Sequence, residues 1–201
     1  MEFDLILILE LIGTVAFAIS GATVAIQCKM DLMGVCILGM TTAVGGGIIR
    51  DVILGITPPT AFQQPIYAMT ALFISFLTFL PMIRKKLDMN GWFFLAIDSI
   101  GLAVFTVIGA LAGTPSGNAF LIIFVGNVTG VGGGVLRDVF ASRNPVIFQK
   151  NVYATASLAG AILFALLYKS NLNAASVIGG AVIFVLRIFA AKFKWHLPRA
   201  E

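Results

Sequence analysis

The sequence predicts an all-α integral membrane protein that forms one transmembrane domain over residues 1–201. Of the 201 residues, 59% are hydrophobic and only 11% are charged, whereas soluble domains carry about 25% charged residues. The hydrophobic residues form runs of about 18 residues or more, the length that a helix needs to cross a bilayer. Two of these runs end in the same motif, three glycines followed closely by an Arg-Asp pair.

Seven such runs predict seven transmembrane helices. They cover approximately residues 5–26, 32–49, 66–83, 91–112, 119–136, 151–168 and 172–191. Clusters that contain proline or glycine at 57–60, 113–117 and 143–145 separate neighbouring runs, because such clusters form loops and end helices. We expect the first run to be a helix rather than a cleaved signal peptide, since Glu2 and Asp4 replace a basic n-region.

The basic residues between the runs predict the orientation. With seven spans, one side holds most of them: Lys29, Arg84, Lys85, Lys86, Arg143, Lys150, Lys192, Lys194 and Arg199. The other side holds the acidic N-terminus and Lys169. The positive-inside rule places the first side in the cytoplasm. The sequence therefore predicts a multi-pass protein of the inner (plasma) membrane, with its N-terminus outside and its C-terminus in the cytoplasm, and it gives no reason to expect nucleic-acid binding.

The chain also contains an internal repeat. The residues around Glu10 match those around Asp98 at an offset of 88, and Tyr67-Ala68 matches Tyr153-Ala154 at an offset of 86. The repeats cover about residues 4–84 and 91–169, with three helices each. Three spans return the chain to the opposite side of the membrane, so the second copy is inverted. The predicted architecture is a 3+3 inverted repeat, common among transporters, with a seventh helix at about 172–191 outside it.

The glycine motifs lie at the ends of the second and fifth helices. The triplets are Gly45, Gly46 and Gly47 in the first copy and Gly132, Gly133 and Gly134 in the second. Each glycine inside a helix costs about 1 kcal/mol relative to alanine. We therefore expect both helices to be kinked or broken at the triplets, with freed backbone carbonyls beside a water-filled path. Further polar groups for this path are Thr41, Thr42, Asn127 and Thr129. The alternative is close helix packing through small residues, including Gly39 and Gly126.

The Arg-Asp pairs place charge within or beside the apolar runs. The pairs are Arg50-Asp51 and Arg137-Asp138. Adjacent residues on a helix do not face each other, so we expect each arginine to reach an acid on another helix. Glu10 and Asp98, the other repeated charges, are the candidates. Charge inside a membrane indicates a functional site. The alternative is that both pairs mark helix ends and reach water.

The doubled motif, its 87-residue spacing and the chain length resemble the prokaryotic members of the trimeric intracellular cation (TRIC) channel family. Bacterial members of this group are also described as glycine transporters. The resemblance covers nearly the whole chain. It implies a homotrimer with a pore in each protomer, between the second and fifth helices, that conducts K⁺ and also Na⁺. By motif match it assigns the pore to both glycine triplets and both Arg-Asp pairs. Animal members carry a lysine-containing motif in place of one Arg-Asp copy, so their support of Ca²⁺ release is not expected here.

A cation channel is therefore the leading function, with monovalent cations and membrane lipids as the expected partners. The alternative is a secondary transporter of a small solute such as glycine, because inverted repeats suit alternating access and an arginine can hold a carboxylate. A purely structural membrane scaffold would gain nothing from the glycine motifs. An enzyme is not expected, since the motifs contain no nucleophile–base pair. No cofactor and no resident metal are expected either, because Cys28 and Cys36 lack metal-ligand spacing.

Overall fold

The computed structural model describes residues 2–84, 91–149 and 152–195, and this part of the chain is helical without strands. Seven described helices are apolar and have 14 residues or more: α1 (Glu2–Gln27), α2 (Leu32–Leu54), α4 (Ile66–Phe79), α6 (Trp92–Gly113), α7 (Ala119–Phe140), α9 (Tyr153–Leu167) and α10 (Leu172–Lys192). Short helices connect them: α3 (Thr60–Gln63), α5 (Pro81–Arg84), η1 (Thr114–Ser116) and α8 (Val146–Gln149). Four of the basic residues used to predict the orientation lie outside the described residues: Lys85, Lys86, Lys150 and Arg199.

Each of the seven predicted runs contains one of these helices, but the helices differ in length, and the run 66–83 is interrupted at Leu80 between α4 and α5. Five of the described helices, α1, α2, α6, α7 and α10, are long and apolar enough to cross a membrane. Helices α4 and α9 have 14 and 15 residues and reach roughly 21–23 Å at 1.5 Å per residue, short of a hydrocarbon core of about 30 Å. The protein is thus a multi-pass membrane protein; five of the predicted spans meet this length criterion, and the count of seven stays a prediction.

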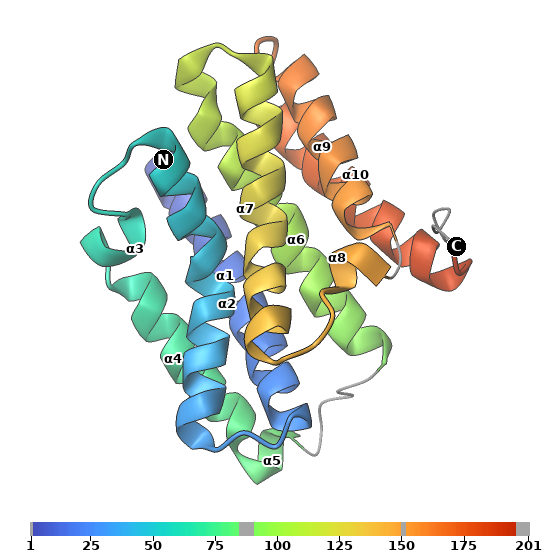
Figure 1. Cartoon of the computed structure of the whole chain (residues 1–201). Helices are drawn as coiled ribbons and strands as arrows, with labels where there is room; N and C mark the ends of the chain where they lie inside the picture. Colours follow the sequence, from blue (N-terminus) through green and yellow to red (C-terminus); the bar gives the residue numbers. More distant parts are fainter. Residues whose placement is uncertain (1, 85–90, 150–151, 196–201) are drawn as a thin grey trace.

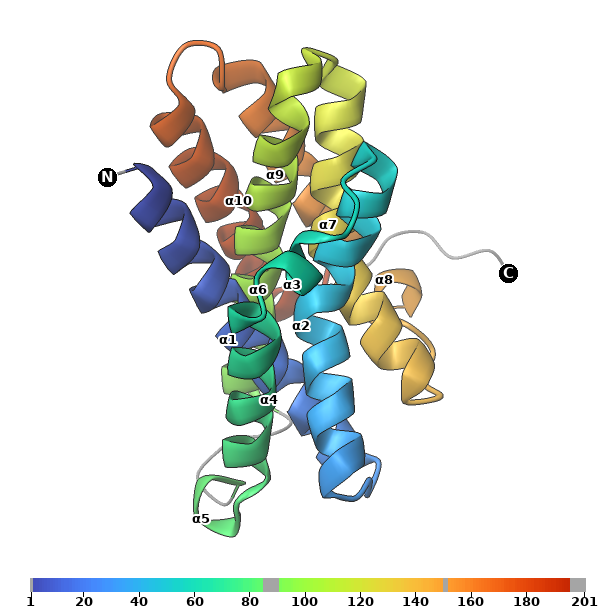
Figure 2. The same ribbon diagram turned by 90° about the vertical axis from the view of Figure 1, so that its left-hand side faces the viewer.

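The helices of each predicted repeat pack together. Helices α1, α2 and α4 contact one another, and so do α6, α7 and α9, while α1–α6 and α2–α7 contacts join the two groups. Figures 1 and 2 show α2 and α7 side by side and running in opposite directions. The rings of Phe17 on α1 and Phe105 on α6, which occupy matched repeat positions, lie 5.3 Å apart between centroids in the core between the groups. Helix α10 covers α9 and α6 from outside.

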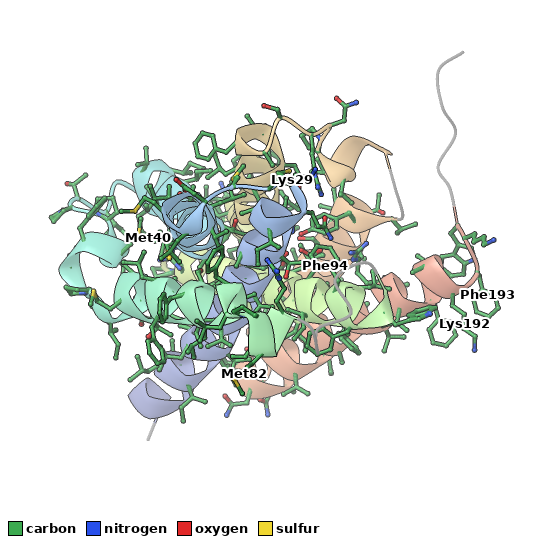
Figure 3. The ribbon with its side chains drawn as sticks, turned by 90° about the horizontal axis from the view of Figure 1, so that it is seen from below. Lys29, Met40, Met82, Phe94, Lys192 and Phe193 are labelled. Carbon is green, nitrogen blue, oxygen red and sulfur yellow. The ribbon has the colours of Figure 1, made fainter. Side chains whose placement is uncertain are left out.

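The connections gather at two ends of the bundle. In Figure 1 the α1–α2 turn, α5, the α7–α8 turn and the end of α10 lie along the lower and right-hand side, and the α2–α3, α6–α7 and α9–α10 connections lie on the upper side. Seen from that end, Lys29 lies near the middle and Lys192 at the edge (Figure 3). The described basic residues of this end are Lys29, Arg84, Arg143, Lys192 and Lys194, against Lys169 at the other. This distribution matches the predicted one, while the orientation in the membrane stays a prediction.

The predicted breaks in the second and fifth helices are wrong. Helix α2 continues through its glycine triplet to Leu54, and α7 continues through its own to Phe140. In a continuous helix the backbone groups keep their hydrogen bonds. A break would leave some of these groups without a partner in a region that holds no water. Helix α2 begins where the Asp31 side chain accepts a 2.7 Å hydrogen bond from the backbone nitrogen of Gly34, and it ends at Gly55, whose φ of +72° suits glycine. Both Arg-Asp pairs therefore lie inside helices rather than beyond their ends.

Candidate functional site

The two glycine triplets meet where α2 crosses α7. A Cβ atom on Gly46 would overlap the backbone carbonyl oxygen of Thr129, and one on Gly133 would overlap that of Thr42. A Cβ on Gly132 would lie 3.3 Å from the Cα of Gly46. The backbones thus approach too closely for side chains at these positions. Close packing, the alternative interpretation of the glycines, accounts for them, because it offsets their low helix propensity.

The remaining glycines of the triplets have different surroundings. Gly45 faces the side chain of Leu136, and Gly134 faces Tyr153, whose hydroxyl oxygen would lie 2.9 Å from a Cβ at that glycine. Gly47 faces open space, since a Cβ there would meet only the Arg50 guanidinium at 3.9 Å. The triplets are therefore not uniform, and Gly47 is the member that borders a cavity.

The predicted polar groups near the triplets do not line this cavity. The hydroxyls of Thr42 and Thr129 are buried and donate 2.6 Å hydrogen bonds to the carbonyl oxygens of Leu38 and Val125, each on its own helix. Thr41 and Asn127 are half-buried, and the Oδ1 atom of Asn127 has no hydrogen-bond partner among the described residues. These four residues lie around the crossing rather than along an open path.

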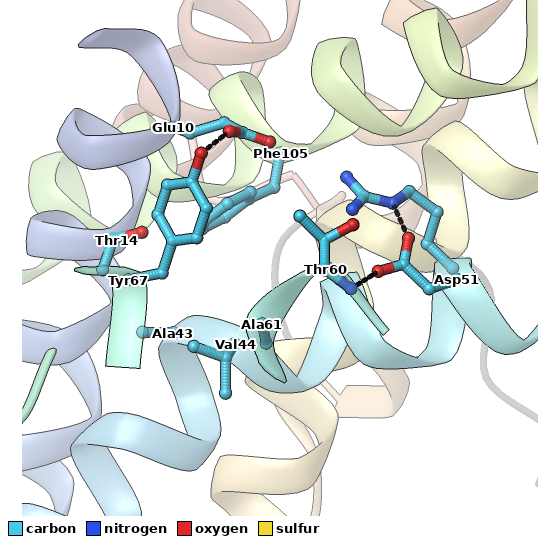
Figure 4. Close-up of a pocket in the computed structure, with 11 residues that line it drawn as sticks. Glu10, Thr14, Ala43, Val44, Asp51, Thr60, Ala61, Tyr67 and Phe105 are labelled. Atoms are coloured by element: carbon cyan, nitrogen blue, oxygen red, sulfur yellow. Dashed lines mark hydrogen bonds and ion pairs between the residues drawn. The ribbon is translucent and has the colours of Figure 1, made fainter. Parts of the chain in front are cut away.

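The first polar cluster consists of residues of the first repeat that line the cavity beside Gly47. Glu10 of α1 accepts a hydrogen bond from the Tyr67 hydroxyl of α4 (Figure 4). The Arg50 Nε atom donates to Asp51 Oδ1 at 2.8 Å, and Asp51 Oδ2 accepts a 2.7 Å hydrogen bond from the Thr60 backbone nitrogen (Figure 4). Glu10 and Arg50 line the same cavity but form no ion pair among the described residues, so the partner predicted for Arg50 is wrong.

The second polar cluster lies beyond the crossing and is densely bonded. Asp98 of α6 accepts from Arg137 Nη1 at 2.6 Å, Ser20 Oγ at 3.0 Å and Arg187 Nη2 at 3.3 Å. The Arg137 Nε atom donates to Asp138 Oδ1 at 2.8 Å. Here the structure joins the predicted partners, Arg137 and Asp98. The ring of Phe94, labelled in Figure 3, lies 5.8 Å from the Arg137 guanidinium carbon on the outer side of this cluster.

The Arg-Asp pairs are built in the same way in both repeats. Contrary to the sequence-based expectation, each arginine pairs with its neighbouring aspartate. The second carboxylate oxygen of each aspartate binds a backbone nitrogen at the start of the next short helix, Thr60 for α3 and Val146 for α8, at 2.7 and 2.9 Å. These bonds fix the carboxylate where it accepts from the arginine Nε. Arg50 and Arg137 are 7% and 1% exposed, so neither arginine extends to the outer surface of the bundle, and Arg50 instead borders the cavity.

Sequence reasoning missed several members of the clusters. Arg187 meets the criterion that singled out Glu10 and Asp98, a charge inside an apolar run, but α10 lies outside the repeat and has no matching residue. Tyr67 and Tyr153 occupy matched positions of the two repeats, and this repetition could have marked them as members of the polar clusters. Ser20 carries no signal in the sequence, because hydroxyl residues are common in apolar helices.

The two polar clusters lie inside an apolar helix bundle, one on each side of the α2–α7 crossing. Arg50 and Arg137 each follow a crossing glycine by four residues, which is about 6 Å along a helix. Because α2 and α7 run in opposite directions, the two clusters lie on opposite sides of the crossing (Figure 1). The cavity beside the first cluster offers the oxygens of Glu10, Asp51 and Thr14. Carboxylate and hydroxyl oxygens are able to replace part of the hydration shell of a cation.

The family model described as glycine transporter matches the chain twice, over residues 7–82 and 95–169. Among curated proteins, the UPF0126 inner membrane protein YadS of Escherichia coli K12 is 38% identical over 191 residues, covering 94% of this chain and 92% of YadS. The UPF0126 membrane protein YvgT of Bacillus subtilis is 37% identical over 193 residues, covering 95% and 94%.

Solved structures of channels superpose on nearly the whole chain. A structure that addresses conductance through TRIC cation channels is 38% identical, with a TM-score of 0.88, and the match covers 100% of this chain and 98% of that one. A prokaryotic TRIC channel in 0.5 M KCl is 30% identical, with a TM-score of 0.89 and coverage of 97% and 100%. The TRIC orthologue from Rhodobacter sphaeroides is 33% identical, with a TM-score of 0.85 and coverage of 95% and 99%.

Proposed function

The chain belongs to the trimeric intracellular cation (TRIC) channel family, and on that premise we propose that it is a passive channel for monovalent cations. The solved relatives that match it over nearly their full length are described as cation channels. K⁺ and Na⁺ are the proposed permeant ions. The proposed place of action is the inner membrane, as for the relative YadS.

The observation that carries this proposal is the cavity beside the first polar cluster. It reaches from Glu10 and Tyr67 to Gly47 at the edge of the crossing. The cavity has a volume of about 30 Å³, and roughly 10–15 Å³ suffices to hold one water. A cavity lined by carboxylate and hydroxyl side chains inside apolar helices supports a pathway for water and small ions, because buried charge is costly in a membrane and therefore indicates a functional site.

The proposed pore passes the α2–α7 crossing, with the glycine triplets, Arg50 and Arg137 beside it. In the continuous helices the crossing glycines pack closely, and Gly47 at the edge of the crossing is the triplet member that borders the proposed passage. In the proposed assembly three copies associate and each protomer conducts through its own pore. The proposed orientation puts the N-terminus outside and the basic end of the bundle in the cytoplasm. Catalysis forms no part of this function.

Single-channel recording tests the proposal directly. The purified protein is inserted in a planar bilayer with a KCl gradient across it. We expect discrete currents that reverse near the K⁺ equilibrium potential, because K⁺ and not Cl⁻ carries them. Currents that reverse near the Cl⁻ potential, or a bilayer that stays silent at protein densities where a known channel conducts, would contradict a cation channel.

A second candidate, a secondary transporter of a small amino acid such as glycine, is favoured by the description of the matching family model. Arg50 beside the cavity is a suitable partner for a substrate carboxylate. Liposomes loaded with glycine separate the two functions. Saturable glycine counterflow without unitary currents indicates the transporter, and unitary currents without counterflow indicate the channel.

A further inference from the structure

The two repeats place equivalent residues around two equivalent positions. Around the first lie Glu10, Arg50, Asp51 and Tyr67. Around the second lie their matched residues, Asp98, Arg137, Asp138 and Tyr153. The arginine–aspartate geometry is the same in both repeats, with 2.8 Å between Nε and Oδ1. Any difference in ion binding between the two positions therefore has a source other than the two arginine–aspartate pairs.

The difference is a cation supplied by α10. The Arg187 guanidinium binds Asp98 at 3.3 Å and lies 4.5 Å from the centre of the Tyr153 ring. It thus lies between the residues that match Glu10 and Tyr67. In the first repeat the tyrosine hydroxyl bonds directly to the acid, whereas the Tyr153 hydroxyl has no hydrogen-bond partner among the described residues. Because α10 lies outside the repeat, the first position receives no such guanidinium.

The surrounding side chains differ in the same direction. Thr14, which lines the first cavity, matches Leu102, and Ala61, which also lines it, matches Ile147. In the second repeat Leu102 belongs to a buried apolar cluster, and Ile147 packs against that cluster. The first position therefore borders a cavity with polar lining residues, whereas apolar side chains take the matched places at the second.

The charges follow this pattern. Glu10, Asp51 and Arg50 give the first cavity a formal net charge of −1. At the second position the two carboxylates of Asp98 and Asp138 are balanced by two arginines, Arg137 and Arg187. Arg187 accounts for the whole difference. An uncompensated negative charge inside a membrane protein attracts one positive charge, because burying it alone is costly.

We propose that the cavity of the first repeat binds one monovalent cation between Glu10 and Asp51, and that Arg187 is a tethered cation that permanently occupies the equivalent position of the second repeat. The hydroxyl oxygens of Thr14 and Tyr67 complete the ligand set. One net charge and the nearby Arg50 guanidinium favour K⁺ or Na⁺ over divalent ions, which require several carboxylates or many oxygen ligands. The inference rests on the proposed function and locates its ion.

The first test measures thermal unfolding of the full-length protein in detergent, with KCl replaced stepwise by N-methylglucamine chloride at constant ionic strength. We expect the unfolding midpoint to rise saturably with K⁺, by about 3 °C at ten times the Kd. Glu10→Gln removes the charge and should abolish the rise. Asp31→Asn is the matched control, because it also removes one carboxylate while asparagine caps α2 equally well. An unchanged rise in Glu10→Gln, or no rise in the unmutated protein, would overturn the site.

The second test exposes the second position. Arg187→Leu leaves a net charge of −1 there, so the K⁺-dependent rise should become larger than in the unmutated protein. Arg187→Lys keeps the tethered charge and should respond like the unmutated protein. If Arg187→Leu does not fold even in high K⁺ while Arg187→Lys does, crystals of the unmutated protein grown with Rb⁺ provide the test instead.

The anomalous signal of Rb⁺ locates a bound ion in these crystals. A peak between Glu10 and Asp51 supports the proposal, and its absence contradicts it.

Bilayer recordings of the same preparations separate this inference from the channel function. Cation currents that persist in Glu10→Gln with unchanged conductance and ion preference would overturn the site and leave the channel standing. A K⁺-dependent midpoint that requires Glu10, in a protein without currents, would support the site and contradict the channel.

Discussion

Gly46 of α2 and Gly133 of α7 pack against each other's helices reciprocally, each on the backbone carbonyl oxygen of a matched threonine, Thr129 or Thr42. This contact holds the two repeats together at their centre. A backbone carbonyl has little freedom to move inside a helix, so any side chain at these glycines displaces a whole helix. The crossing is therefore the part of the molecule most sensitive to added volume.

Alanine at the crossing tests this directly. Gly46→Ala and Gly133→Ala should each destabilise the protein by about 1–3 kcal/mol, the usual cost of overpacking. Gly47→Ala is the control on the same triplet, because its Cβ meets only the Arg50 guanidinium at 3.9 Å and alanine favours the helix. The unfolding midpoint in detergent is the measurement. Equal effects of all three substitutions would mean that the crossing does not limit stability.

The two arginines should differ in their importance for stability. Arg137 bonds to Asp98, Ser20 and Asp138, whereas the described partner of Arg50 is Asp51 alone. Removing one partner of a buried ion pair costs about 3–5 kcal/mol; Arg137→Ala leaves two buried carboxylates without this partner and Arg50→Ala only one, so Arg137→Ala should lower the unfolding midpoint more. For conductance we expect the reverse order, because Arg50 lines the cavity. Thermal unfolding and bilayer recording of both variants measure the two rankings, and matching losses in stability would contradict the asymmetry.

Much of the fold was predictable from the apolar runs, because their length and boundaries depend on composition and on loop-forming residues. The sequence placed the ends of two helices at Arg50 and Arg137, whereas both helices continue past these residues. A hydropathy pattern stops at a charge, whereas the structure neutralises each arginine with its neighbouring aspartate and lets the helix continue. The glycine triplets were ambiguous for a related reason. Propensity gives the cost of a glycine, but only the opposing helix decides whether that cost is offset by close packing.

The candidate site was predictable where both repeats carry the signal. Asp98 and Arg137 were linked by their repeated charges, and the structure joins them at 2.6 Å. Glu10 and Arg50 carry the same signal but are not paired, because Tyr67 bonds to Glu10 and leaves a cavity between them. Arg187 lies outside the repeat, so a comparison of the two halves did not reach it. The asymmetry that distinguishes the two sites is thus contributed by α10, the helix outside the repeat.

The aspartates should control the short helices that follow them. Asp51 and Asp138 each accept a hydrogen bond from the first backbone nitrogen of the next short helix, at Thr60 and Val146. Asp138→Ala should therefore accelerate hydrogen exchange in residues 141–147, and Asp51→Ala should do so in residues 56–63. Mass spectrometry after deuterium labelling measures both. Each variant serves as the control for the other, and faster exchange spread equally over both segments would indicate general destabilisation instead.

The matched tyrosines give a prediction about conduction. The Tyr67 hydroxyl binds Glu10 at the cavity, whereas the Tyr153 hydroxyl has no hydrogen-bond partner among the described residues. Tyr67→Phe frees the Glu10 carboxylate to reorient and changes the oxygen lining of the cavity, so single-channel conductance should change. Tyr153→Phe removes an unsatisfied hydroxyl and should leave both conductance and stability nearly unchanged, since a buried unpaired polar group contributes no favourable bond. If both variants conduct like the unmutated protein, ions do not pass beside Glu10, and the pathway must avoid the first cavity.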